Sequence, residues 1–268
     1  MLARMPTTPG TAPLLDCADL DVSVGGRLLV DGLRLTVRPG DFIALLGPNG
    51  VGKTLTLKTL AGLRPTARGS IRLRDDSLET LDRRSVARRL GLLLQEHADA
   101  FPATVLEIAL LGRHSHRGFW DWNDAPGMTL ARDALARMDL QGLEHRLAAR
   151  LSGGERRRLA LSTLLVQDPQ LFLLDEPMNH LDPWHRFTVL QTFSELAASG
   201  RGVVASLHDP ALATRYANRC LLLFGDGRWE FGAREDLLTE QRLESLYATP
   251  FRRFTAGDDE VLLPSPQA

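Results

Sequence analysis

The sequence predicts an α/β fold in which helices cover both faces of a parallel β-sheet. Short continuous apolar runs, such as Phe42–Leu46 and Leu171–Leu174, are typical of strands buried on both faces. Segments with helical spacing of apolar residues alternate with these runs. The 268 residues are 44% hydrophobic and 24% charged, a globular composition that excludes disordered, collagen-like and coiled-coil proteins.

Two hairpins are expected at the two ends of this pattern. Residues 14–37 alternate apolar and polar side chains around Gly25-Gly26, and a second turn signal stands at Gly225-Asp226-Gly227. Between them, apolar runs predict buried strands over residues 42–46, 88–94, 171–174 and 203–207.

Helices are predicted where apolar residues recur with helical spacing. They cover residues 53–63, 103–112, 126–138, 152–166, 183–198 and 210–217. Proline at or near the first position opens the last two. Residues 1–12 and 256–268 are expected to be flexible tails.

Charge and composition exclude several classes of function. The chain has 32 Lys and Arg residues and 33 Asp and Glu residues, so its net charge is close to zero. Nucleic-acid binding driven by overall positive charge is therefore not expected. No apolar stretch is long enough to span a membrane, and the N-terminal segment lacks the apolar core of a signal peptide, which predicts a cytosolic chain. Cys17 and Cys220 are too few for a disulfide framework and are expected to be buried.

A phosphate-binding loop is the strongest motif. Residues 47–54, Gly-Pro-Asn-Gly-Val-Gly-Lys-Thr, match the GxxxxGK[ST] pattern between a buried strand and a helix. Its glycines let backbone N–H groups surround a phosphate, and Lys53 adds a compact charge for the β- and γ-phosphates. Lysine occurs only twice in this arginine-rich chain, at Lys53 and Lys58. The predicted ATP-binding residues are Gly47, Pro48, Asn49, Gly50, Val51, Gly52, Lys53, Thr54 and Leu55.

Two adjacent carboxylates follow the apolar run 171–174. Asp175 and Glu176 stand at the end of a predicted parallel strand, where ligands bind in open α/β sheets. Asp175 is the expected Mg²⁺ partner, together with the Thr54 hydroxyl. Glu176 is expected to polarise the water that attacks the γ-phosphate.

A third motif, Leu151-Ser-Gly-Gly-Glu155, precedes a predicted helix and lies about 20 residues before the acidic strand. With it, the chain resembles an ABC-type nucleotide-binding domain over nearly its whole length. The motifs stand in the family's order: the loop 47–54, Gln95, 151–155, 171–176, 179–182 and His208. The resemblance implies a P-loop NTPase with a RecA-like core, an N-terminal antiparallel β subdomain and an inserted helical subdomain. It places one ATPase domain over 13–255, with the helical subdomain at about 96–160.

The resemblance also implies a site shared by two chains. In a head-to-tail homodimer, each ATP would lie between the P-loop of one subunit and the signature of the other: Ser152, Gly153, Gly154 and Glu155. Asp182 would communicate across the interface, His208 would contact the γ-phosphate, and Gln95 would touch Mg²⁺ or the attacking water. ATP and Mg²⁺ are the implied cofactors.

Two positions depart from the family pattern. Val24 stands where an aromatic residue usually stacks on adenine, and Leu55 stands where many relatives carry Ser or Thr. The pair His114 and His116, without a third ligand, is not expected to bind a metal.

The segments 104–108, 111–117, 179–182 and 246–251 resemble importers of iron–siderophore, haem and cobalamin. The implied protein is a peripheral ATPase on the cytoplasmic face of the membrane. Its partners would be transmembrane permease subunits and, indirectly, a substrate-binding protein. The alternatives are a zinc or manganese importer ATPase, an exporter ATPase, or a soluble ABC ATPase that acts on ribosomes or DNA.

Overall fold

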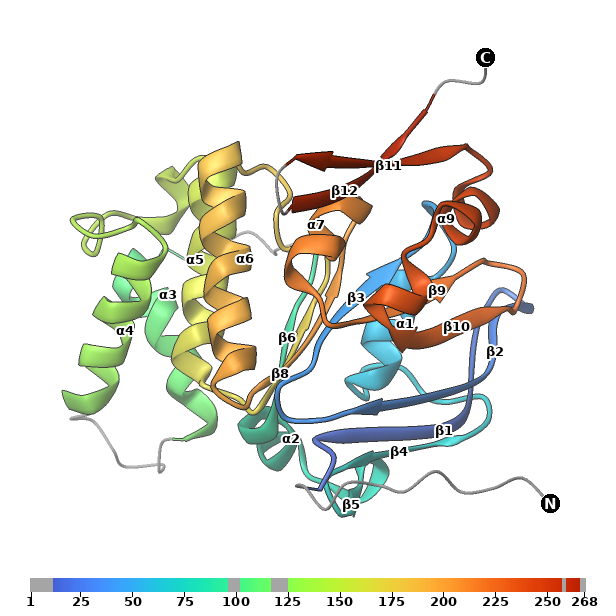
Figure 1. Ribbon diagram of the computed structural model, residues 1–268. Helices are drawn as coiled ribbons and strands as arrows, with labels where there is room; N and C mark the ends of the chain where they lie inside the picture. Colours follow the sequence, from blue (N-terminus) through green and yellow to red (C-terminus); the bar gives the residue numbers. More distant parts are fainter. Residues whose placement is uncertain (1–11, 96–101, 117–124, 257–258, 266–268) are drawn as a thin grey trace.

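The fold is organised by a six-stranded sheet (Figure 1). The computed structural model describes residues 12–95, 102–116, 125–256 and 259–265. The strand order is β10-β9-β3-β8-β7-β6; the five strands from β9 to β6 are parallel, and β10 is an antiparallel edge. The strands are β3 (Phe42–Leu46), β6 (Leu90–Leu93), β7 (Leu171–Leu174), β8 (Gly202–Ser206), β9 (Arg219–Leu223) and β10 (Trp229–Ala233). All five parallel strands therefore end at the same edge.

A second, antiparallel sheet lies against this one (Figure 1). It is built from β1 (Leu15–Val24), β2 (Arg27–Val37), β4 (Ser70–Leu73) and β5 (Asp76–Ser77). The β1–β2 hairpin turns at Gly25 and Gly26, both with positive φ, which explains why glycines stand there. The predicted α/β class and the N-terminal antiparallel hairpin are confirmed.

Helices fill both sides of the parallel sheet. The longer ones are α4 (Ala125–Arg137), α5 (Gly153–Gln167) and α6 (Pro183–Ala198). The shorter ones are α1 (Lys53–Leu60), α2 (Arg83–Arg89), α3 (Val105–Leu110), α7 (Pro210–Tyr216), α8 (Arg234–Leu237) and α9 (Glu240–Tyr247), with the 3₁₀ turns η1 (Leu78–Thr80), η2 (Leu111–Ser115) and η3 (Ala148–Arg150). Figure 1 shows α3, α4 and α5 together at one side of the molecule. No helix in the described ranges combines the length and apolar character that a bilayer crossing requires.

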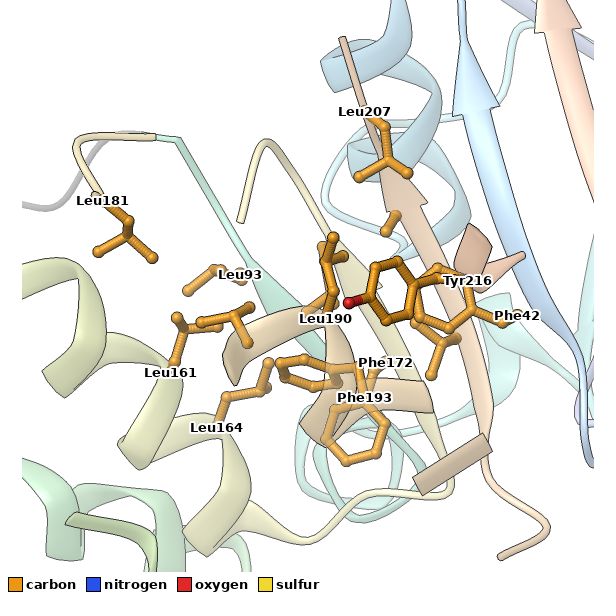
Figure 2. Packing of buried hydrophobic residues seen from close by; sticks show 14 of the residues in the cluster. Phe42, Leu93, Leu161, Leu164, Phe172, Leu181, Leu190, Phe193, Leu207 and Tyr216 are labelled. Carbon is orange, nitrogen blue, oxygen red and sulfur yellow. The ribbon is translucent and has the colours of Figure 1, made fainter. Parts of the chain in front are cut away.

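The sheet separates two hydrophobic cores, and alternate residues of β3 serve each one. Phe42, Ala44 and Leu46 belong to the helix-side core under α3 to α7, whereas Ile43 and Leu45 belong to the hairpin-side core with β1, β2 and α1. Figure 2 shows the helix-side core, where the rings of Phe172 and Phe193 meet edge to face with centroids 5.3 Å apart. Burial of β3 on both faces explains its continuous apolar sequence.

The C-terminal region differs from the prediction. The flexible tail predicted over 256–268 is wrong for residues 259–264, because β12 (Asp259–Pro264) pairs with β11 (Phe251–Ala256). The hairpin buries Phe251 and Leu262 in the helix-side core, and β12 packs on α7. These contacts explain why this segment forms a strand rather than a flexible tail. The strands β4 and β5 and the helices α2, α8 and α9 were not predicted either, and α1 ends at Leu60 rather than near Leu63. The first eleven residues of the predicted N-terminal tail lie outside the described residues.

Candidate active site

The phosphate loop connects β3 to α1 at the carboxyl edge of the sheet. Gly47 has φ 151° and Gly52 has φ 105°, and a Cβ atom at Gly47 would lie 2.4 Å from the carbonyl oxygen of Leu223. Glycine is therefore required by the backbone and by the close approach of β9. Because Gly52 precedes α1 without a capping side chain, the amides of the first helical turn are available to an anion.

Lys53 is the buried cation of this loop. It is 6% exposed, and its Nζ donates to the carbonyl oxygens of Gly47 at 2.7 Å and Pro48 at 3.0 Å. Burial lowers the pKa of Lys53, while the charges of Glu176 and Asp175 act in the opposite direction. The ammonium group therefore lies within electrostatic reach of the acidic strand end.

Asp175 occupies a buried position directly after β7. It is fully buried; one oxygen, Oδ1, accepts a 2.9 Å hydrogen bond from the Ser206 hydroxyl. The other oxygen, Oδ2, has no hydrogen-bond partner within the described part of the chain. A buried carboxylate oxygen without a donor fits a hard cation such as Mg²⁺, which prefers oxygen ligands. The predicted set of Asp175, Thr54 and Gln95 supplies such oxygens.

Glu176 is surrounded by nitrogen donors from three segments. Its Oε1 lies 2.7 Å from His208 Nε2, and its Oε2 accepts from Gln95 Nε2 at 2.9 Å and from Asn179 Nδ2. Gln95 follows β6 and His208 follows β8, the strands nearest β7 on either side. The strand order thus brings together all three residues that were predicted to be catalytic.

The backbone of Glu176 is held in an uncommon conformation. Its φ of 46° lies in the left-handed region that non-glycine residues rarely adopt. The Glu176 amide donates to Ser206 Oγ at 2.8 Å, so one hydroxyl orients both consecutive carboxylate residues. A strained residue supported by several contacts is typical of functional sites.

Three residues beside these carboxylates were not predicted as site residues: Asn179, Ser206 and Arg157. Asn179 lies inside the 179–182 motif, and Ser206 ends a buried strand, so neither position alone indicates a partner. Arg157 stands in the run Arg156–Arg158, which resembles an exposed helix face. Its spacing from Leu161 and Leu164 places it on the buried face, and all three are at most 4% exposed.

The signature residues form the start of α5. Ser152 is the N-cap: its Oγ accepts from the Glu155 amide at 3.2 Å, while the Glu155 carboxylate accepts from the Ser152 amide at 2.7 Å. Ser152 and Gly153 are exposed, and a Cβ atom at Gly153 would meet nothing within 4 Å. Packing within this chain therefore does not require glycine at position 153.

Asp182 begins α6 and connects two parts of the molecule. It caps the helix by accepting from the His185 amide at 3.0 Å, and its Oδ2 lies 2.6 Å from His185 Nδ1. The other ring nitrogen of His185 lies 3.2 Å from Oδ2 of Asp139, which follows α4 by two residues. The hydrogen bonds from the backbone and the ring of His185 lower the pKa of Asp182.

His116 contacts the protein backbone, and the two cysteines are buried. His116 Nε2 lies 2.8 Å from the Gln167 carbonyl oxygen, and His114 lies in the 3₁₀ turn η2. No cluster of metal-ligating side chains occurs among the described residues. Cys17 and Cys220 are both buried, and burial raises the pKa of each thiol to about 12.

A phosphate loop, two carboxylates and the residues Gln95 and His208 thus share one sheet edge, and comparison with known proteins gives the same reading. The ABC transporter family matches residues 30–179, more than half of the chain. This chain belongs to the ABC transporter family. As predicted, its fold is that of the family's ATP-binding domain, and the chain is an ATPase.

Relatives and solved structures match nearly the full length of this ABC protein. The hemin import ATP-binding protein of Streptomyces coelicolor is 36% identical, over 97% of this chain and 92% of the relative. That of Rhizobium meliloti is 31% identical, over 95% and 99%. A chain of a metal-chelate type ABC transporter, solved in an inward-facing conformation, is 26% identical with a TM-score of 0.82, over 95% of this chain and 98% of that chain.

Proposed function

We propose that this chain is the ATP-hydrolysing subunit of an importer that takes up a metal chelate of the haem, iron–siderophore or cobalamin class. The observation that carries the ATPase assignment is the Glu176 carboxylate, held between Gln95 and His208 on the edge that carries the phosphate loop. The likeness to hemin import proteins over nearly the full length supports the direction and the class of substrate.

Binding of ATP begins at the phosphate loop. Lys53 exchanges its bonds to the Gly47 and Pro48 carbonyls for the β- and γ-phosphates, a task suited to a compact ammonium group. The loop amides and the first turn of α1 bind the remaining phosphate oxygens. A bound Mg²⁺, held by Thr54, Asp175 and Gln95, would neutralise charge that develops on the phosphates.

Hydrolysis uses the carboxylate of Glu176. A water attacks the γ-phosphorus, the bond from phosphorus to the β–γ bridging oxygen breaks, and ADP leaves with the electron pair. Glu176 accepts the proton of the attacking water as general base. His208, beside Glu176, contacts the γ-phosphate, and Gln95 and Asn179 keep the carboxylate aimed at the water.

The signature acts on the ATP of a second subunit in a head-to-tail homodimer. Two observations support this. Ser152 and Gly153 stand at an exposed helix N-terminus, and open space around Gly153 leaves room for an incoming phosphate. Ser152 Oγ accepts from Glu155 and keeps its own proton for donation. Asp182 lies in the neighbouring loop and carries the contact between subunits.

The permease subunits bind the helical subdomain on the cytoplasmic face of the membrane. Leu111 is 61% exposed, next to a shallow hollow lined by Glu107, Leu110 and His114. An exposed leucine beside a hollow suits an inserted partner helix. Closure of the ATPase dimer moves this surface and switches the permease between its inward and outward states.

Reconstitution tests the proposal. The chain and its permease are placed in lipid vesicles, the substrate-binding protein and hemin are added on one side, and ATP-dependent hemin accumulation is measured. Lys53→Ala is expected to abolish uptake. Lys58→Ala is the matched control on the same helix, because the Lys58 side chain has no hydrogen-bond or salt-bridge partner in the described part of the chain.

Other results would select the alternatives. ATP-dependent uptake of free zinc or manganese in place of hemin indicates a metal-ion importer. ATP-driven loss of substrate without a binding protein indicates an exporter. Stimulation of the ATPase by ribosomes or DNA would contradict the transport proposal.

A further inference from the structure

Arg157 is a buried cation that no step of the proposed mechanism uses. It lies on α5, five residues after Ser152, and is 4% exposed. Its guanidinium donates to four backbone carbonyls: Leu94 at 2.5 Å, Asp175 at 2.5 Å, Glu176 at 2.6 Å and Pro177 at 3.3 Å. One side chain therefore binds the ends of both β6 and β7.

These carbonyls belong to the catalytic segments. Leu94 directly precedes Gln95, and the other three carbonyls belong to Glu176 and to the residues on either side of it. Glu176 has the left-handed φ of 46°, so its backbone depends on outside contacts to stay in place. The planar guanidinium, with donors in a fixed fork, holds several carbonyls in one relative arrangement.

An arginine is a costly choice for this position. Burial lowers its pKa to about 10, opposed by the charges of Asp175 and Glu176, so the group stays charged at neutral pH. The other buried residues on this helix face, Leu161 and Leu164, are apolar. Packing alone would be satisfied by a third leucine, since a buried charge is unfavourable unless fully hydrogen bonded.

We propose that Arg157 is a positioning residue that couples the signature helix to the hydrolytic carboxylate of the same chain. The proposal rests on the function proposed above, in which the start of α5 binds the ATP of the partner subunit. Ser152 and Arg157 lie within about one and a half turns of one helix, so they move together. When the partner's ATP engages Ser152, Arg157 brings the backbone of Glu176 and Gln95 into register for hydrolysis at this chain's own ATP. Arg157 thus makes the two ATP sites cooperative.

The test uses Arg157→Gln and Arg157→Lys in the full-length protein reconstituted with its permease. ATP hydrolysis is measured against ATP concentration, and ATP binding is measured separately. For Arg157→Gln we expect kcat to fall about 10- to 100-fold, the Kd for ATP to change less than threefold, and the Hill coefficient to fall from above one to one. Lysine keeps the charge but not the fork, so Arg157→Lys is expected to recover part of kcat and little of the cooperativity.

Arg158→Gln is the matched control for loss of a guanidinium. Arg158 lies on the same helix and donates to the carbonyls of Met138 at 2.8 Å and Asp139 at 2.5 Å and to the Asp139 carboxylate at 3.3 Å, so its partners do not include Asp175 or Glu176. It is expected to lower the melting temperature while keeping kcat within threefold and the Hill coefficient above one. Arg157→Gln and Arg157→Lys are compared with it below their melting temperatures.

Defined outcomes would overturn the proposal. If Arg157→Gln keeps its cooperativity, or loses no more kcat than Arg158→Gln, Arg157 does not couple the sites. If Arg157→Gln loses ATP binding in parallel with kcat, its role is structural; should this variant not fold, Arg157→Lys decides by the same readouts. If the active wild-type protein hydrolyses ATP without cooperativity, both the proposed dimer and the coupling are overturned. If the wild type and the Arg157 variants are all cooperative, the coupling alone is contradicted.

Discussion

Replacing Glu176 with glutamine removes the basicity of this side chain and keeps its size and shape. Oε2 accepts from Gln95 and Asn179, while Oε1 lies 2.7 Å from His208 Nε2. The glutamine oxygen is therefore expected at the Oε2 position, with its NH₂ group toward His208 Nε2. A neutral imidazole can accept there by changing its tautomer. The side chain stays in place, and what is lost is a group able to take a proton.

The size of the effect follows from that loss. Removing a positioned general base reduces turnover by about 10²–10⁴, which corresponds to roughly 3–5.5 kcal/mol in the activation barrier. ATP affinity is expected to stay within about threefold or to increase, because the described residues include no hydrogen bond from the Glu176 side chain to the phosphate loop and the substitution removes its negative charge from the site.

Two assays separate chemistry from binding. Phosphate release is followed after mixing the purified protein with ATP, and the Kd is measured with a fluorescent ATP analogue. Glu195→Gln is the matched control, because Glu195 is exposed on α6 and its carboxylate accepts a hydrogen bond from Gln191 on the same helix. Turnover of Glu176→Gln within fivefold of wild type would refute the role of Glu176 as base. Loss of turnover in Glu195→Gln would show that the assay reports damage to the fold.

Three further predictions concern other parts of the site. Gly47→Ala places a Cβ atom 2.4 Å from the Leu223 carbonyl oxygen, so we expect a loss of about 1–3 kcal/mol in urea unfolding; unchanged stability would mean that the loop relaxes freely. Val24→Tyr, at a position 46% exposed, is expected to tighten ATP binding about 2- to 10-fold by stacking on adenine, and an equal or weaker Kd would contradict this. Glu155→Gln removes a carboxylate that accepts a hydrogen bond from the Ser152 amide. This hydrogen bond lowers the pKa of Glu155 below its ordinary value of 4.5. That carboxylate stabilises the fold above pH 4.5 and ceases to do so as the pH falls through its lower folded-state pKa. The stability difference from wild type is therefore expected to shrink between about pH 5 and pH 3, and a constant difference would contradict the assignment.

The catalytic edge was predictable because each motif stands directly after a buried strand. Parallel strands end at one edge, so the positions of Gln95, Glu176 and His208 in the chain already indicated that they meet. The hairpin of β11 and β12 was not predictable in the same way. Its order depends on burying Phe251 and Leu262 against elements far away in the sequence, while its other residues resemble an exposed tail.

The burial and the hydrogen-bond partners of Arg157 were harder to predict from the sequence. Three consecutive arginines usually indicate a solvated helix face, and only the helical spacing from Leu161 and Leu164 indicates that the middle one is buried. Even that spacing cannot show which carbonyls lie within its reach, because they come from β6 and β7. For Val24, the sequence showed that the usual aromatic residue is missing, and the structure adds that the side chain is exposed.

The alternation along β3 has a consequence for how the protein unfolds. Successive residues of Phe42–Leu46 point into opposite cores. The central strand therefore packs against the helices on one face and against the antiparallel sheet on the other. A slip of one residue would exchange every one of these side chains between the two environments. Neither half can melt while the other keeps this strand in register. We therefore expect denaturant to unfold both cores in a single cooperative transition, with tryptophan fluorescence and helical circular dichroism changing together.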